Sequence, residues 1–297
     1  MFRLDPSLVF AFGSLLFAGV NDLVFKKQAM SGHGRGQYIA LCGLVWMLVF
    51  ALLALASGHN RIAPSAVYWG LIAGTFSVVG NYLLITSLRH LDASVGATIY
   101  RLNLVLAAMI AFLLLAEPLT PMKLIGLALA VVAIFLFAEK KNGGSPDAGK
   151  KWALILVIIA SCLRAGMAIS YKLAANQFAI LQSQGWNSQQ HWFLSVQGFM
   201  WLFVGLIFAF RFENPVKFAA ANVGYGLLSG GLICGIVLLL AKALAAGQAS
   251  VVVPITQMSF LVTALLSWPL IRERFSPRKI TALAVAAVAV LALTLSI

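Results

Sequence analysis

Charged residues, and acidic ones above all, are scarce in this chain of 297 residues. Asp, Glu, Lys and Arg make up 10% of it, against about a quarter in soluble globular proteins. Hydrophobic residues make up 62%, which leaves too few charged side chains to cover a water-exposed surface. This composition excludes an ordinary soluble domain and predicts a protein whose surroundings are the lipid bilayer.

Cysteine and histidine are also few. The three cysteines, Cys42, Cys162 and Cys234, fall inside separate apolar runs, where a thiol acts as a small hydrophobic group. The four histidines lie near the ends of apolar runs and lack the spacing of metal ligands. We therefore expect no disulfide, no metal site and no cofactor. Because the chain also lacks a convergent nucleophile or carboxylate pair, we do not expect an enzyme.

Long apolar runs are abundant. A helix needs about 20 apolar residues to cross the hydrocarbon core of a bilayer, and the chain divides into ten runs of about that length. The sequence therefore predicts an all-α integral membrane protein with ten transmembrane helices. The predicted spans are 7–27, 37–57, 67–88, 93–115, 120–138, 152–175, 191–210, 222–245, 249–271 and 276–296.

The chain contains an internal repeat. Residues 68–137 align with residues 224–293 at a constant offset of 156 without a gap, and 20 of these 70 pairs are identical. Apolar composition alone would not align Glu117 with Glu273 or Lys123 with Lys279. Because each half holds five helices, an odd number, the second half must enter the membrane upside down. The sequence thus predicts two inverted five-helix repeats.

The formal net charge of +13 is distributed unevenly among the loops. Fourteen of the 21 Lys and Arg residues follow the first, third, fifth, seventh and ninth helices, and such an excess is typical of cytoplasmic loops. Both chain termini are therefore predicted outside the cytoplasm, and the basic charge does not indicate a nucleic-acid partner. We expect a multi-pass protein of the plasma membrane, or of the cytoplasmic membrane if it is bacterial.

An acidic turn ends the fourth helix of each half. Glu117 is followed by Thr120 and Pro121, and Glu273 by Ser276 and Pro277. Thr or Ser before Pro is typical of a helix start, so each carboxylate is expected near the positive end of the next helix. We interpret both glutamates as structural, although a direct transport role stays open. Glycines on helices three and eight, such as Gly70, Gly74, Gly226, Gly230 and Gly231, predict close helix packing.

These residues resemble the drug/metabolite transporter superfamily, in particular ten-helix proteins with EamA-type domains. The resemblance is carried by residues 93–126, where Ala-Ser-Val precedes an apolar helix that ends in Glu117. The equivalent segment of the second half, residues 249–282, carries it as well. It implies one EamA-type repeat over 1–139, a polar loop over 140–151 and a second repeat over 152–297. It also implies a central cavity, a peripheral last helix in each half, and cytoplasmic termini, which conflicts with the loop charges.

Polar residues without a twin in the other half are the candidates for a substrate site. Arg164 aligns with Ala18, and Arg101 with Gln257. An arginine near the bilayer centre costs about 2.5 to 3.5 kcal/mol on insertion scales, so each needs compensation. Arg164 either binds the substrate or is held structurally by a salt bridge or by backbone carbonyls. Arg101 either binds the substrate or snorkels to the membrane interface. Lys172, near a helix end, is interpreted as snorkelling.

Further polar residues lie on the same helices. Asp22 is either paired with Lys26 one turn later or acts as a proton-coupling carboxylate or arginine counter-ion. Pro254 removes a backbone hydrogen bond from helix nine, and the resulting kink would aim Gln257 inward. The complete set of predicted substrate-binding residues is Arg164, Arg101, Tyr100, Asn103, Gln257, Asn81, Tyr82 and Asn21.

Two intramembrane arginines beside one embedded acid favour an anionic substrate. The leading hypothesis is a secondary transporter that moves a small polar organic metabolite across the bilayer by alternating access. The alternative is a lipid-carrier flippase subunit or a non-transporting membrane partner protein. The sequence does not define the oligomeric state and is compatible with a monomer; substrate identity and direction also stay undefined.

Overall fold

The computed structural model describes residues 5–31, 34–58, 61–87, 99–137, 148–213, 220–271 and 277–296. All regular secondary structure within these residues is helical, and eight of the helices are long and apolar enough to cross a membrane. Two shorter apolar helices span Ile99–Leu114 and Pro121–Leu136. The helices are α1 (Pro6–Met30), α2 (Arg35–Ala56), α3 (Pro64–Ser87), α5 (Asn103–Leu114), α6 (Pro121–Phe137), α7 (Ala148–Ser183), α8 (Gln189–Phe212), α9 (Ala220–Ala246), α10 (Ala249–Gln257), α11 (Phe260–Ile271) and α12 (Pro277–Thr294).

Every one of the ten predicted spans contains a helix, so the prediction of an all-α membrane protein is confirmed. The largest difference lies in the sixth span, because α7 starts at Ala148 and continues to Ser183. The long polar connection before α8 is therefore mostly helical, and Gly185 turns the chain with a positive φ of 82°. Thr120 caps α6 as predicted, since the Lys123 amide donates to its hydroxyl at 3.3 Å.

The fourth helix of each half is interrupted at the same repeat position. The first interruption falls at Leu102, just before α5, and the second at Met258, between α10 and α11. These two residues are equivalent at the offset of 156. Discontinuous membrane helices leave backbone groups free to bind side chains or ligands. The two interruptions therefore mark the part of the bundle where polar groups gather.

Helices that correspond in the two halves pack against each other. α2 contacts α8, α6 contacts α12, and α5 contacts α10, while α1 contacts α9 and α3 contacts α7. The pair of α2 and α8 runs antiparallel, because Gly43 lies on the backbone of Leu202 and Gly198 on the backbone of Met47. Paired helices of opposite direction are the arrangement that an inverted repeat produces.

Small residues set the distance between these helices. Gly70 and Gly74 of α3 lie against Val196 and Met200 of α8, and Gly226 and Gly230 of α9 make the equivalent contacts with α2. A Cβ at any of these four glycines would come within 3.0 Å of the neighbouring helix. The predicted packing role is confirmed for them, whereas Gly231 faces open space.

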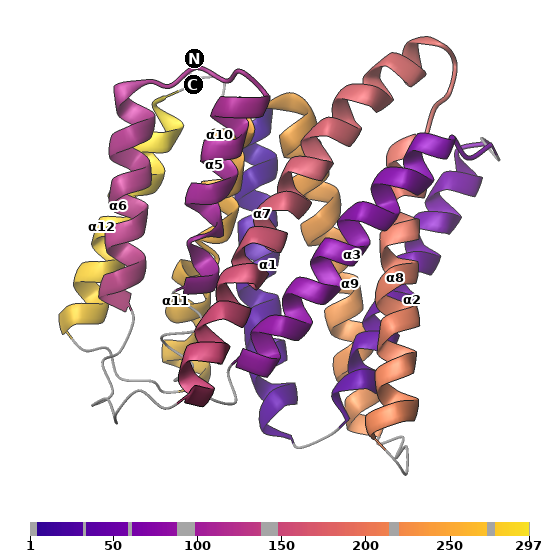
Figure 1. Ribbon diagram of the computed structural model, residues 1–297, viewed down its shortest axis with the longest axis horizontal. Helices are drawn as coiled ribbons and strands as arrows, with labels where there is room; N and C mark the ends of the chain where they lie inside the picture. Colours follow the sequence, from indigo (N-terminus) through magenta and orange to yellow (C-terminus); the bar gives the residue numbers. More distant parts are fainter. Residues whose placement is uncertain are drawn as a thin grey trace.

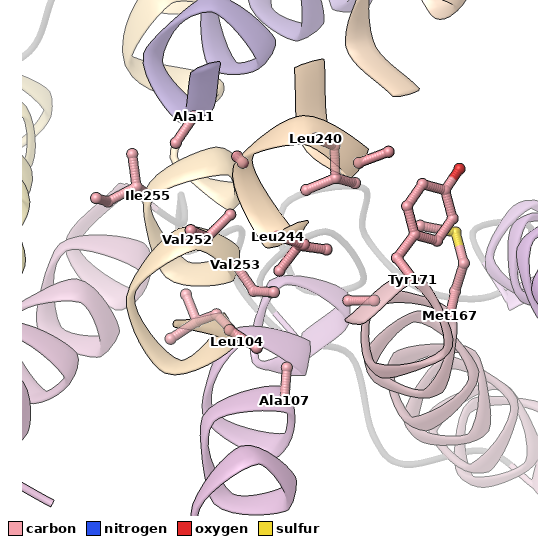
Figure 2. Packing of buried hydrophobic residues seen from close by; sticks show 14 of the residues in the cluster. Ala11, Leu104, Ala107, Met167, Tyr171, Leu240, Leu244, Val252, Val253 and Ile255 are labelled. Atoms are coloured by element: carbon pink, nitrogen blue, oxygen red, sulfur yellow. The ribbon is translucent and has the colours of Figure 1, made fainter. Parts of the chain in front are cut away.

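α6 and α12 lie side by side at one edge of the bundle (Figure 1), as the resemblance implied for the last helix of each half. The buried core extends through the bundle and includes residues of both of these helices. Figure 2 shows Leu104 and Ala107 of α5 beside Val252 and Val253 of α10, with Leu244 of α9 close by. All five are fully buried. The fourth helices of the two halves therefore meet in an apolar layer at the centre of the bundle.

Candidate functional site at the interrupted helices

Arg101 lies beside the interruption of the opposite fourth helix. Its Nη1 donates to the backbone carbonyl of Gln257 at 3.0 Å, and its guanidinium carbon lies 4.8 Å from the centre of the Phe260 ring. A carbonyl and an aromatic face both stabilise a cation. Arg101 is therefore held by α10 and α11, and these contacts favour an interior position over snorkelling to the interface.

The interruption of the ninth predicted span explains why the Gln257 carbonyl accepts this bond. The Leu261 amide, which would bond to Gln257 in a continuous helix, donates instead to Met258 at 2.9 Å. The Gln257 carbonyl is thereby released from the helix ladder. Gln257 thus contributes its backbone, rather than only the side chain expected from the sequence.

Asp22 of α1 faces α11. Its Oδ2 accepts hydrogen bonds from the hydroxyls of Ser259 at 3.2 Å and Thr263 at 3.1 Å. The carboxylate also interacts electrostatically with both Arg101 and Arg164. Of the two interpretations from the sequence, these contacts favour a counter-ion to the arginines.

Arg164 of α7 is the least satisfied cation of this cluster. Its Nη1 donates to the Met167 sulfur at 3.4 Å, a weak acceptor. Its Nε is buried and has no hydrogen-bond partner among the described residues. Tyr100 and Tyr171 lie within electrostatic range of its charge. Arg164 therefore carries an unused donor into a region with one nearby carboxylate and two arginines.

Comparison with known proteins agrees with this architecture. Residues 6–138 match the EamA-like transporter family. This match covers a little under half of the chain and lies in its first predicted repeat. It supports a multi-pass membrane transporter.

One curated relative and one solved structure are also similar to this chain. Glucose-6-phosphate/phosphate translocator 2, chloroplastic, of Arabidopsis thaliana is 22% identical over 136 residues, which cover 40% of this chain and 34% of the translocator. The chain therefore matches only about a third of that relative. A crystal structure with 14% identity covers 100% of both chains with a TM-score of 0.81. That likeness shows a shared fold.

Three further predicted site residues, Tyr100, Asn103 and Asn21, lie on the same helices as Arg101 and Asp22. Asn103 is fully buried and turns its Nδ2 onto the Tyr100 carbonyl at 2.6 Å, so it caps the interruption at Leu102. Its Oδ1 is buried without a partner among the described residues. Asn21 accepts a hydrogen bond from Ser229. These contacts place Tyr100, Asn103 and Asn21 on the elements around Asp22.

Asn81 and Tyr82 have different surroundings. The Asn81 side chain donates to the Ser77 carbonyl one turn earlier at 2.8 Å. The Tyr82 ring is 42% exposed and lies 4.7 Å from the ring of Phe208 on α8. The contacts described for these two residues lie on α3 and α8 rather than at the interrupted helices.

Several interior polar residues were not predicted from the sequence. The Tyr171 hydroxyl donates to Gln197, whose amide donates to the Ala73 carbonyl at 3.4 Å, and Trp201 donates to Ser77 at 2.9 Å. Tyr171 and Gln197 lie well inside α7 and α8. A search for polar residues at buried helix positions would have found them, whereas a search for residues without a twin favoured the charged ones.

Glu117 contacts helices of both halves. Its two carboxylate oxygens accept the backbone amides of Ala249 at 2.7 Å and Ser250 at 2.9 Å. It therefore caps α10 in the other half, a contact that the sequence did not predict, while it also interacts electrostatically with Lys123 in the first turn of α6. The contact with α10 arises because the chain turns at Ala116, in the left-handed region with φ of 51°. Glu273 lies outside the described residues.

Proposed function

We propose that this protein is a secondary transporter that moves a small anionic organic metabolite by alternating access. The observation that carries the proposal is the buried Arg164 Nε, which has no hydrogen-bond partner among the described residues. A buried donor destabilises the protein unless it finds a hydrogen-bond acceptor. The planar fork of a guanidinium matches the geometry of a carboxylate or phosphate. A substrate oxyanion would supply the acceptor that the described side chains do not.

Two features support alternating access around this position. The interruptions at Leu102 and Met258 bring free backbone groups next to Arg101. The corresponding helices of the two halves also pack antiparallel, and inverted halves can exchange conformations around a fixed central site. Tyr100, Gln257 and Asn103 would line this site with the arginines, and Asn21 would lie beside Asp22.

The arginine site is tested with purified protein in liposomes. A panel of carboxylated and phosphorylated metabolites is first screened by thermal shift, because a ligand of the folded state raises its apparent stability. Arg164→Ala is expected to lower uptake of each hit by about a hundredfold, since a charge-assisted bidentate contact is lost. Arg164→Lys should recover only part of it, because an ammonium lacks the planar fork.

The control for this experiment is Arg211→Ala, an arginine in the last turn of α8, which should leave uptake unchanged. A set of hits dominated by cations, or equal uptake by the Arg164→Ala and unmodified proteins, would contradict the anion site. The name of the plant relative, a translocator of glucose-6-phosphate and phosphate, supports phosphorylated sugars as the first compounds to screen.

We further propose that Asp22 couples transport to protons. An anionic substrate would compete with the Asp22 carboxylate for the two arginines, and protonation of Asp22 would remove that competitor. Uptake should then rise when the compartment that holds the substrate is made more acidic. Asp22→Asn should abolish this dependence on the pH gradient, and a dependence that persists in the variant would exclude the role.

A further inference from the structure

The connection between α9 and α10 is bound at one end by a side chain of α7 and at the other by a side chain of the α5–α6 connection. Lys172 of α7 donates from Nζ to the carbonyls of Leu244 at 2.8 Å and Gly247 at 2.6 Å. Glu117 accepts the amides of Ala249 and Ser250 on the other side of the turn. A cation at a helix C-terminus and an anion at a helix N-terminus are each favourable. Lys172 therefore binds the C-terminal end of α9.

A second lysine strengthens this connection. Lys123 of α6 is fully buried and donates from Nζ to the Pro118 carbonyl at 2.8 Å and to the side chain of Gln248. Glu117 interacts electrostatically with both Lys123 and Lys172. Backbone groups in a membrane protein need partners within the protein, and those of this turn are bound by Lys172 and Glu117, while Lys123 binds the side chain of Gln248. We call Glu117, Lys123, Lys172 and the turn 244–250 the clasp.

The clasp joins the two halves of the chain. Glu117 and Lys123 belong to the first predicted repeat, whereas Lys172 and the turn 244–250 belong to the second. Close to it lies the apolar layer of Figure 2, in which Leu244 and Val253 are fully buried. Val253 stands on α10 between the amides that Glu117 binds and the interruption at Met258. Along α10, the clasp binds the first residues of the helix, the layer packs on its middle, and Arg101 binds the carbonyl at its end.

From these contacts we propose that the clasp is a gate, in which Glu117 and Lys172 are positioning residues for transport. It is closed in this structure and opens when α10 and its turn move away from Glu117. The inference rests on alternating access in the proposed function, because rearrangement of the two halves must break contacts between them at one end. The gate acts through helix ends and does not touch the substrate.

The opening of the gate is measured with a thiol reporter. Cys42, Cys162 and Cys234 are replaced by alanine, Val253→Cys is added, and labelling by a water-soluble maleimide is followed on purified full-length protein. Glu117→Gln is expected to raise the labelling rate about tenfold, since charge-assisted hydrogen bonds to the turn are weakened. Lys172→Gln should act in the same direction and serves if the first variant does not fold.

Glu213→Gln is the matched control. Glu213 accepts the amides of Gly36 at 2.6 Å and Gln37 at 3.4 Å, so it caps α2 just as Glu117 caps α10. This change should leave labelling of Val253→Cys unaltered. An equal increase with Glu213→Gln, or no increase with either clasp variant, would overturn the proposal. The labelling requires no substrate, so its outcome is independent of the arginine site.

A reversible covalent cross-link across the clasp distinguishes a gate from a static contact. Lys123→Cys and Gln248→Cys are joined by a cleavable bifunctional thiol reagent in the same background, and liposome uptake of a screened metabolite is measured. Uptake should stop on cross-linking and return when the cross-link is cleaved. The controls are the two single-cysteine variants treated with the same reagent. Uptake that continues at the same rate in the cross-linked protein would show that the clasp does not open and would overturn the proposal.

Discussion

Replacing Gly43 by alanine is expected to lower the free energy of unfolding by about 3 kcal/mol, the upper range for overpacking a rigid interior. A Cβ at this position would lie 2.2 Å from the backbone nitrogen of Leu202, and one at Gly198 would lie 2.5 Å from that of Met47. Backbone atoms cannot rotate away as a flexible side chain can. α2 and α8 would have to separate along their length.

The measurement is thermal unfolding of purified protein in one detergent, combined with the yield of monodisperse protein. Gly198→Ala should give an effect of the same size, because the two glycines occupy corresponding places on the paired helices. Gly231→Ala is the control, since a Cβ there meets nothing within 4 Å and alanine is favoured over glycine in a helix. Equal stability of Gly43→Ala and Gly231→Ala would contradict the described α2–α8 contact.

Asp22→Ala is expected to destabilise the protein by about 3 kcal/mol, because removal of one member of a buried charged cluster leaves its partners uncompensated. The carboxylate binds Ser259 and Thr263 and faces two arginines. Its loss would leave the charges of Arg101 and Arg164 without this counter-ion. Uptake should fall as well, since the interrupted helices would lose a contact with α1.

A double-variant cycle separates these effects. Arg101→Met in the Asp22→Ala background should recover part of the stability, because the buried charge that lost its partner is then removed as well. Asp22→Asn serves as the isosteric control, since its side-chain oxygen can still accept from the hydroxyls. If the two single changes were additive in thermal unfolding, Asp22 and Arg101 would not be coupled, and the counter-ion role would be excluded.

The helices were predictable because each one satisfies a local requirement. A bilayer demands about 20 apolar residues per crossing, and Thr120 with Pro121 marks a helix start by chemistry confined to adjacent residues. The repeat added the positions of the glycine contacts, since the same small residues recur in both halves. The length of the apolar runs and the identical residues of the internal repeat were thus enough to predict most of the fold.

The site was less predictable because it depends on contacts between distant residues. The alignment identified Arg101 as a residue without a twin, yet nothing local shows that it binds the Gln257 carbonyl. The adjacent residues of the sequence relate Glu117 only to the start of α6. The turn at Ala116 also brings its carboxylate to the start of α10. The partner of a polar side chain is decided by packing of helices more than a hundred residues apart.

The pairing of each helix with one from the opposite half has a consequence for synthesis. While the first five helices are being inserted, the groove beside Gly43 has no occupant, because α8 has not yet been translated. The first half must therefore stay in the membrane without these helix contacts until α8 is inserted. Folding is slow when most contacts join distant segments of the chain. Truncation before α8 would remove a partner from several earlier helices at once, so a shortened product should be degraded rather than assembled.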